Sequence, residues 1–321
     1  MGHGFTPWLT DTVQMDGVSE MNAQVNASDS SPFHPQAEIQ VRQNLDFQID
    51  RADMPRFWFD NNPFKTRIFD ALSITFPVGE RYFISSVRLF RDQITDPELA
   101  ARVQDFIRQE AQHGIAHERY NQFLVKQGQP LDKLLAFITA RMSDDLKTKS
   151  PEMNLAMTAA AEHITALMAE CFFAQRSTLE KADPNMRAML AWHAIEEMEH
   201  KDVAYDVMQD VAKVDYRTRA YALALIGVMM PTFTLIRANM MLKTDGFSRR
   251  ERLRMLRDGL PWLIGRQGML TPLRKPFMSW FKRDFHPNDH AVVHNYPVWL
   301  DVFETTGDAL KAGEAFWQAG R

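Results

Sequence analysis

The sequence predicts an all-α fold, a four-helix bundle with additional C-terminal helices. Three helix starts share one signal, in which an N-capping Asp or Ser precedes a proline in the first turn, at Asp96-Pro97, Ser150-Pro151 and Asp183-Pro184. Almost no segment alternates apolar and polar residues convincingly as a strand does, and there is no repeat of solenoid period. We therefore expect helices to form the core.

Composition excludes several classes of protein. The chain has 321 residues and 45% hydrophobic content, which is enough for one large core. Its net charge of −4 provides no basic field, so nucleic acid is not expected as a partner. The single cysteine, Cys171, excludes a disulfide within the chain and fits a reducing compartment. No basic region followed by an apolar run opens the sequence, so we expect a cytoplasmic protein rather than a secreted one.

Three regions are expected along the chain. Residues 1–35 mix Gly, Ser, Asn, Asp and Pro without periodicity and are expected to be disordered or irregular. Residues 36–213 carry the long helices and are expected to form the bundle. Residues 214–321 are expected to form a helical extension packed on it.

The first long helix is expected over about residues 64–93. Pro77 lies inside it, three residues before Glu80, and a proline there should kink or restart the helix. That change of direction is a means of aiming the Glu80 carboxylate. Further helices are expected over about 97–126, 131–147, 151–181 and 184–213.

The C-terminal region holds an uncharged segment, Ala220–Ile236, whose length is marginal against the ~20 residues that span a bilayer. It predicts either a fifth helix buried on the bundle or a surface that contacts membrane or lipid. Ser248 and Glu251 form a capping box that opens a basic helix to about residue 264, and a basic face attracts anionic lipid. A weak helix is expected over about 304–317.

The candidate metal ligands form a pattern that occurs twice. In each half a single glutamate on one helix is followed by Glu-x-x-His on the next, and the glutamates are 30 and 35 residues apart. Residues i and i+3 of a helix face the same way, so the glutamate can bridge two metal ions while the imidazole binds one of them. The alternative is a chance set of surface acids and capping histidines. The candidates are Glu80, Glu110, His113, Glu162, Glu197 and His200.

Other side chains lie close to this pattern. His193 precedes Glu197 by one turn, so it is either a third imidazole ligand or a hydrogen-bond partner of a ligand. His117 is expected to support the ligands by hydrogen bonds or to line a pocket, with direct ligation as the alternative. Glu196 and Glu199 flank Glu197, but neither stands three residues before a histidine.

The helix that carries Glu162 has two further residues that could bind a metal. Glu170 is the reserve ligand on that helix. His163 directly follows Glu162 and therefore points about 100° away from it. We expect His163 to be a packed or solvated histidine.

At these residues the chain resembles the ferritin-like di-iron carboxylate superfamily, over about residues 65–213. The run from His193 through Glu197 to His200 is also similar to the arylamine N-oxygenases, whose fourth helix supplies an additional histidine ligand. More closely, the segments 76–83, 110–117 and 285–287 resemble a bacterial family labelled "predicted metal-dependent hydrolase". The resemblance implies a di-metal site whose ligands are Glu80, Glu110, His113, Glu162, His193, Glu197 and His200.

The leading functional hypothesis is an O₂-activating di-iron oxidoreductase in which Glu110 and Glu197 bridge the metals and are catalytic. Oxygen-rich ligand sets favour two Fe ions, with Mn or a mixed Mn/Fe pair as alternatives. Such an enzyme would hydroxylate, N-oxygenate or desaturate an apolar small molecule or acyl substrate. A long apolar pocket to the metals is expected, with residues 220–236 and the Trp- and Phe-rich tail as its walls.

Partners and rival functions follow from the same features. The sequence has no dinucleotide-binding fingerprint and no cysteine cluster, so an oxygenase would need an external electron donor. The first alternative is a binuclear hydrolase that lowers the pKa of a bridging water. The second is non-enzymatic iron binding or storage, which does not explain the long apolar extension. Peripheral membrane contact and a homodimer are also considered.

Overall fold

The computed structural model describes residues 38–321, so the expectation for residues 1–35 lies outside it. Within the described residues the all-α prediction is confirmed, and the only β-type pairing among them is an isolated bridge between Phe59 and Ala182. The helices are α1 (Pro63–Ser73), α2 (Phe76–Arg88), α3 (Pro97–Lys126), α4 (Asp132–Thr148), α5 (Pro151–Phe173), α6 (Pro184–His200), α7 (Val203–Asp206), α8 (Tyr216–Thr244), α9 (Arg249–Ile264), α10 (Arg274–Ser279), α11 (Tyr296–Thr306) and α12 (Ala309–Gln318). Shorter helical turns lie at Arg91–Gln93, Arg176–Thr178, Val207–Val211, Thr271–Leu273 and Pro287–Asp289.

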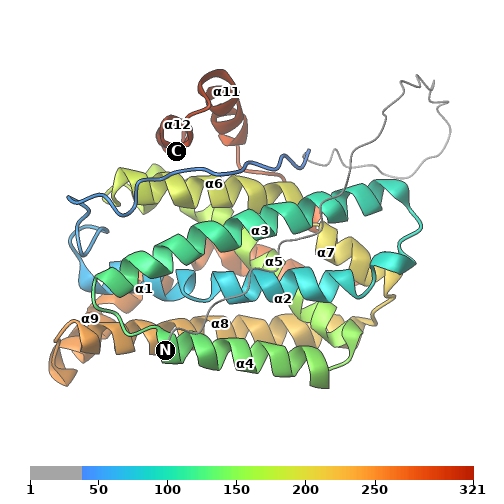
Figure 1. The fold of residues 1–321 in the computed structure, drawn as a ribbon, viewed down its shortest axis with the longest axis horizontal. Coiled ribbons are helices and arrows are strands. Elements are labelled where there is room, and N and C mark those ends of the chain that lie inside the picture. The colour runs from blue at the N-terminus through green and yellow to red at the C-terminus, as the bar shows by residue number, and fades with distance from the viewer. Residues whose placement is uncertain (1–37) are drawn as a thin grey trace, which may run out of the picture. The chain divides into compact units, whose positions relative to one another are not determined.

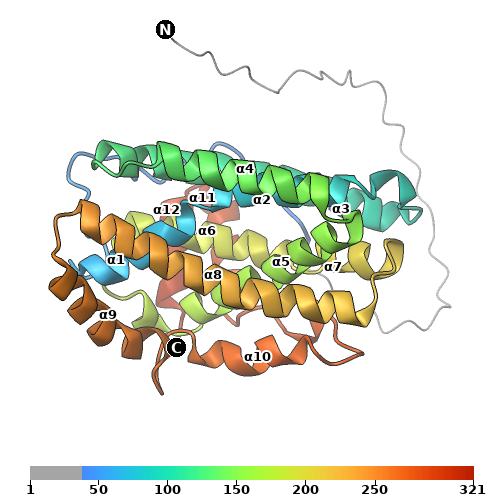
Figure 2. The same cartoon turned by 90° about the horizontal axis from the view of Figure 1, so that it is seen from below.

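Four helices enclose the centre of the described fold. Helix α2 packs against α3 and α5, and α6 packs against α5 and α3. The remaining helices cover this group, with α4 on α2, α8 on α5 and α1, and α12 on α6 (Figures 1 and 2). The predicted caps explain three of the starts, since Asp96, Ser150 and Asp183 each accept a backbone N–H of the first turn of α3, α5 and α6.

The expected first helix is two helices. Helix α1 ends at Ser73 and α2 begins at Phe76, which places Pro77 in the first turn of α2. A proline ring clashes with the carbonyl four residues earlier, and Ser73 occupies that position. Pro77 therefore ends α1 and restarts the chain as α2, three residues before Glu80.

Tertiary contacts shorten two of the other expected helices. Helix α5 ends at Phe173 instead of about 181, because the C-terminal residue Arg321 hydrogen-bonds to Ala174 and Arg176. Helix α6 ends at His200 instead of about 213, and Asp202 just beyond it is bound by side chains from α3 and from the tail. Helices α10 and α11 were not expected, because their segments are rich in proline and aromatic residues.

Helix α8 is longer than the uncharged segment that predicted it and has two different faces. Its inner face is buried against α1 and α5. In residues 38–321 it is the one helix that by length and composition could cross a membrane, and 22% of its most apolar window is buried. The helix is therefore neither fully buried nor detached. Its exposed apolar residues include Tyr221, Val228, Phe233, Ile236 and Met240.

A buried ion cluster joins α8 to α1. Arg67 of α1 is fully buried, donating from Nε to Asp245 Oδ2 at 2.7 Å and from Nη1 to Asp70 Oδ2 at 2.5 Å. Asp245 caps the end of α8 and is itself 1% exposed along its side chain. The guanidinium thus binds acids from both helices, so α8 is tied to the bundle by charge as well as by apolar contact.

We predict that Asp245→Asn lowers the free energy of unfolding by about 3 kcal/mol, because it leaves part of the buried Arg67 charge without a partner. Asp258→Asn is the matched control, since Asp258 pairs with Arg257 at the surface and such pairs contribute about 0–1 kcal/mol. Urea titration of both variants measures the difference. Equal stability of the two variants would contradict the structural role given to Arg67.

Candidate metal centre

All seven predicted ligands and His117 meet in the core between α2, α3, α5 and α6. None of these residues is more than 6% exposed. Their donor atoms fall into four overlapping groups, and within each group the atoms lie within 4.8 Å of one another. The groups are Glu80, His117 and His193; His113, His193 and Glu197; Glu110, Glu162, Glu197 and His200; and Glu80, Glu110 and His113.

Helical spacing explains why these side chains converge. Glu110 and His113 occupy one face of α3, and Glu197 and His200 occupy the equivalent face of α6. Glu80 approaches α3 closely, since a Cβ placed on Gly114 would lie 3.2 Å from its Oε2. A larger residue at position 114 would therefore press against the carboxylate.

The inner donor atoms of the cluster have no hydrogen-bond partner although they are buried. These atoms are both carboxylate oxygens of Glu80, Glu110 and Glu162, together with Nδ1 of His113 and Nε2 of His200. His200 Nε2 lies 3.3 Å from Glu110 Oε1 and 3.2 Å from Glu162 Oε2 without hydrogen-bond geometry. Unpaired carboxylates are costly in a dry interior, and a divalent cation compensates that cost. The residues present therefore fit a metal.

The electrostatics also indicate carboxylates that need a cation. Burial and the nearby Glu110 raise the pKa of Glu80 well above its usual value and raise that of Glu162 to about 8. For His200, burial lowers the pKa, but the carboxylates of Glu162 and Glu197 outweigh it, so the pKa is raised.

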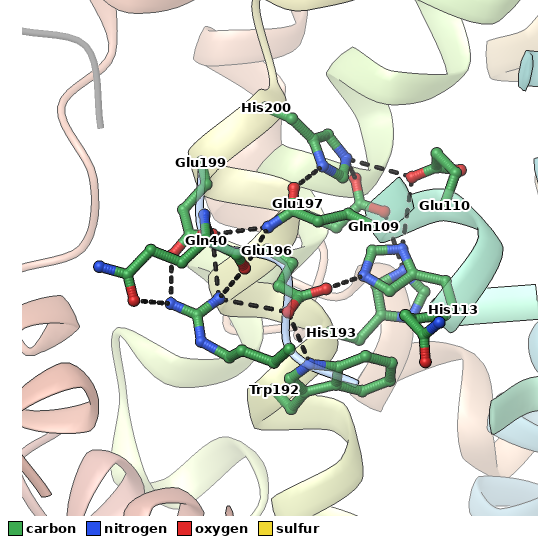
Figure 3. A network of polar contacts seen from close by, with 12 residues as sticks. Gln40, Gln109, Glu110, His113, Trp192, His193, Glu196, Glu197, Glu199 and His200 are labelled. Carbon is green, nitrogen blue, oxygen red and sulfur yellow. Dashed lines mark hydrogen bonds and ion pairs between the residues drawn. The ribbon is translucent and has the colours of Figure 1, made fainter. Parts of the chain in front are cut away.

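Hydrogen bonds outside the cluster fix the orientation of two imidazoles (Figure 3). His113 Nε2 lies 3.0 Å from Glu196 Oε2, and His200 Nδ1 lies 2.8 Å from Gln109 Oε1. Both oxygens accept, so the outer nitrogen of each ring carries the proton and donates it. When the ring is neutral, the inner nitrogen, which faces Glu110, carries the lone pair that can bind a metal ion. This arrangement is the usual support of histidine ligands in metal sites.

The supporting network continues to the segment before α1. The buried Arg42 donates to Glu196 Oε1 at 3.2 Å and to Glu199 Oε1 at 2.7 Å. Gln109 Nε2 donates to Glu199 Oε2 at 2.7 Å, and Trp192 Nε1 donates to Glu196 Oε1 at 2.8 Å. Arg42 therefore offsets Glu196, which holds the His113 ring, and Glu199, which holds Gln109.

The supporting role of Glu196 and Glu199 does not follow from the Glu-x-x-His pattern. The one available signal is their helical offset from Glu197, which turns them toward another face of the helix. Gln109 and Arg42 gave no local signal. Arg42 reaches the site from far along the chain, and only the fold brings it there.

His193 and His117 belong to a hydrogen-bonded row beside the cluster. Ser73 Oγ lies 2.8 Å from His117 Nδ1, His117 Nε2 lies 2.7 Å from His193 Nδ1, and His193 Nε2 lies 2.8 Å from Glu197 Oε1. His117 contacts no carboxylate in this row but belongs to the donor group with Glu80 and His193, so its supporting role stays a prediction. His193 bonds to a candidate ligand and also lies within two of the donor groups, so its ligation stays a prediction.

Two residues near the predicted site lie outside it. His163 is 3% exposed and packs against Trp280 and Phe285, and burial lowers its pKa to about 3, as expected of a packed histidine. Glu170, the reserve candidate, belongs to none of the four donor groups and borders surface pockets on the far side of α5.

An apolar pocket of about 290 Å³ lies between α2, α4, α5 and α8. A smaller hollow of about 50 Å³ reaches His117, His193 and Glu197. The two share Leu72, Phe76 and Thr165 in their walls. Thr165 Oγ1 donates to Glu197 Oε2 at 2.5 Å, so the shared wall touches the cluster directly.

Of the two segments expected to line the pocket, one lines it and the other does not. Residues of α8, including Met229, Met230 and Phe233, line it as expected. The Trp- and Phe-rich tail does not; Trp280 and Phe285 pack around His163 instead.

The fold and the cluster define an all-α protein with a buried carboxylate and histidine site suited to metal. A family model described as "predicted metal-dependent hydrolase" matches residues 41–291, well over half of the chain. The chain belongs to this family. No curated protein and no solved structure matches it.

We predict that Glu110→Ala removes most of the bound metal, because Glu110 lies in two of the donor groups and faces both inner imidazole nitrogens. Glu170→Ala is the control, an acid of α5 outside the cluster, and it should retain the metal. Elemental analysis of both purified variants decides the point. Full metal content in the Glu110 variant would refute the site.

We also predict that Gln109→Leu weakens metal affinity by roughly 10- to 100-fold, because it removes the acceptor that orients His200. Gln112→Leu, on the same helix but bonded only weakly to the backbone of Asn44, is the control. Competition with a coloured chelator measures both affinities. An unchanged affinity in the Gln109 variant would mean that the outer hydrogen bond does not support the ligand.

Proposed function

We propose that this chain is a binuclear metal-dependent hydrolase that acts on an apolar ester or acyl substrate. The observation that carries the proposal is the set of inner donor atoms without partners, above all His113 Nδ1 and His200 Nε2, whose outer nitrogens are held by Glu196 and Gln109. The membership of the chain in a family described as metal-dependent hydrolases supports this chemistry over its rivals.

In this proposal the ligands are Glu80, Glu110, His113, Glu162, Glu197 and His200, with His193 as a seventh. Bound divalent metals would supply an activated water at neutral pH and a Lewis acid for the substrate carbonyl. We propose Glu110 and Glu197 as the catalytic acids, and Glu197 is held in position by Thr165 and His193. The row from His193 through His117 to Ser73 fixes the orientation of the ring that contacts Glu197.

The pocket fits a substrate of this class. Phe76 packs against the rings of His117 and His193, with centroids 4.6 and 5.0 Å apart, and separates the pocket from the cluster. The apolar lining of the pocket would bind an acyl chain and limit the access of bulk water to the metal centre.

The second candidate is a di-iron oxidoreductase that uses O₂ and an external electron donor. Four carboxylates in a buried, mainly apolar setting favour this candidate, because oxygen-rich sites suit Fe or Mn. The pairing of two Glu-x-x-His helices with two single-Glu helices is also that of ferritin-like di-iron proteins, and we propose this relationship for α2, α3, α5 and α6.

We predict that the protein hydrolyses p-nitrophenyl decanoate without O₂ in a metal-dependent way. Chelation should abolish turnover, and reloading with Fe(II), Mn(II) or Zn(II) should restore it, because the carboxylates alone provide no activated water. Glu197→Ala should be inactive, whereas Glu170→Ala should turn over normally.

Measurement of O₂ uptake by the Fe(II)-loaded protein with an oxygen electrode tests the alternative, the di-iron oxidoreductase. Rapid O₂ uptake together with no ester hydrolysis would replace the hydrolase by the oxidoreductase. Neither activity, with iron still bound, would leave iron binding or storage.

A further inference from the structure

Arg237 of α8 lines the apolar pocket without an acidic partner. Within residues 38–321 no carboxylate lies within 4.0 Å of its guanidinium, and its side chain donates to Thr75 Oγ1 at 2.6 Å. Three of the buried arginines, Arg42, Arg67 and Arg187, each contact a carboxylate. The fourth, Arg219, donates to the Tyr205 hydroxyl and to two backbone carbonyl oxygens. Arg237 is therefore a cation held at an apolar surface by a hydroxyl group alone.

The acid that borders the same pocket is already neutralised. Asp145 is bound by Arg141 Nη2 at 2.8 Å and by Lys149 Nζ. Burial lowers the pKa of Arg237 to about 10, and no neighbouring carboxylate raises it again. The pocket consequently keeps one uncompensated positive charge.

The rest of the pocket wall is apolar and adaptable. Apart from Thr75, Tyr82, Thr165 and Thr234 and the charged groups described, the lining is aliphatic, aromatic or methionine, and methionine adjusts to the shape of an aliphatic guest. The ring of Phe233, which is exposed, lies 5.9 Å from Arg237 Cζ. An apolar chain and an anionic group thus find complementary surfaces in one cavity.

A guanidinium without a partner is costly at an apolar surface, and its planar fork matches a carboxylate. We propose that this pocket binds an amphipathic carboxylate, an aliphatic chain with a free carboxylate group that is held by Arg237. This inference rests on the proposed function. It narrows the substrate to an apolar molecule whose carboxylate group lies far from the bond that is hydrolysed.

The test compares decanoate with decanol by titration calorimetry, using the protein as isolated and after removal of metal by a chelator. Decanoate should bind more tightly than decanol in both forms. Arg237→Gln should weaken decanoate binding by roughly 10- to 100-fold and leave decanol nearly unchanged, because only the carboxylate loses a charged partner. Arg237→Lys should retain part of the affinity.

Two further variants keep the test decisive. Arg141→Gln is the matched control: it borders the pocket but is committed to Asp145, so decanoate affinity should stay within about twofold. Gly79→Leu should weaken both ligands, because a side chain at Gly79 enters open space in the pocket. Thermal unfolding shows whether each variant is folded.

Equal binding of decanoate and decanol, or an Arg237→Gln variant with full decanoate affinity, would overturn the inference. Decanoate binding that disappears with the metal would also overturn it, since the carboxylate would then be a metal ligand. If the protein does not hydrolyse the ester but still binds decanoate through Arg237, the proposed function is refuted and this inference is retained.

Discussion

The structure depends on the burial of four carboxylates at one point between α2, α3, α5 and α6. Glu80, Glu110, Glu162 and Glu197 repel one another there, and the imidazoles offset only part of their charge. Such a group is stable in a dry core only with cations among its oxygens. The outer residues follow from this constraint, because rings that present a bare nitrogen to a cation need an acceptor behind them. Glu196 and Gln109 supply those acceptors, and Arg42 offsets the additional acids.

The helices outside the central four give the centre its surroundings. Helix α8 lies along α5 with one face buried and the other exposed, and its inner side completes an apolar pocket beside Phe76 and Thr165. Helix α12 packs on α6, so the two ligand helices α5 and α6 are covered by different parts of the C-terminal region. A pocket on one side and a charged network on the other make the centre asymmetric. Substrate access is therefore expected from the side of α2, α5 and α8.

The same ligands support two chemistries, and the surroundings decide between them. Hydrolysis needs water and a substrate at the metals, whereas oxidation needs a dry site and a supply of electrons. The family to which the chain belongs favours hydrolysis. The carboxylate-rich donor set favours metals that also react with O₂, which is why the absence or presence of O₂ is the informative variable.

The sequence by itself determined the helices and the ligand pattern, because helix caps and the spacing of Glu-x-x-His are local properties of the chain. It placed Glu110 with His113 and Glu197 with His200 on single faces, and the all-α fold was predicted for the same reason. It could not determine where helices end through distant contacts, as α5 does against Arg321, nor the role of Arg42, which joins Glu196 and Glu199 across the fold. Arg237 is the same kind of case. Its sequence neighbourhood is an ordinary apolar helix. Only the packing of α8 against α1 and α5 leaves its charge facing a cavity whose acid, Asp145, is already paired.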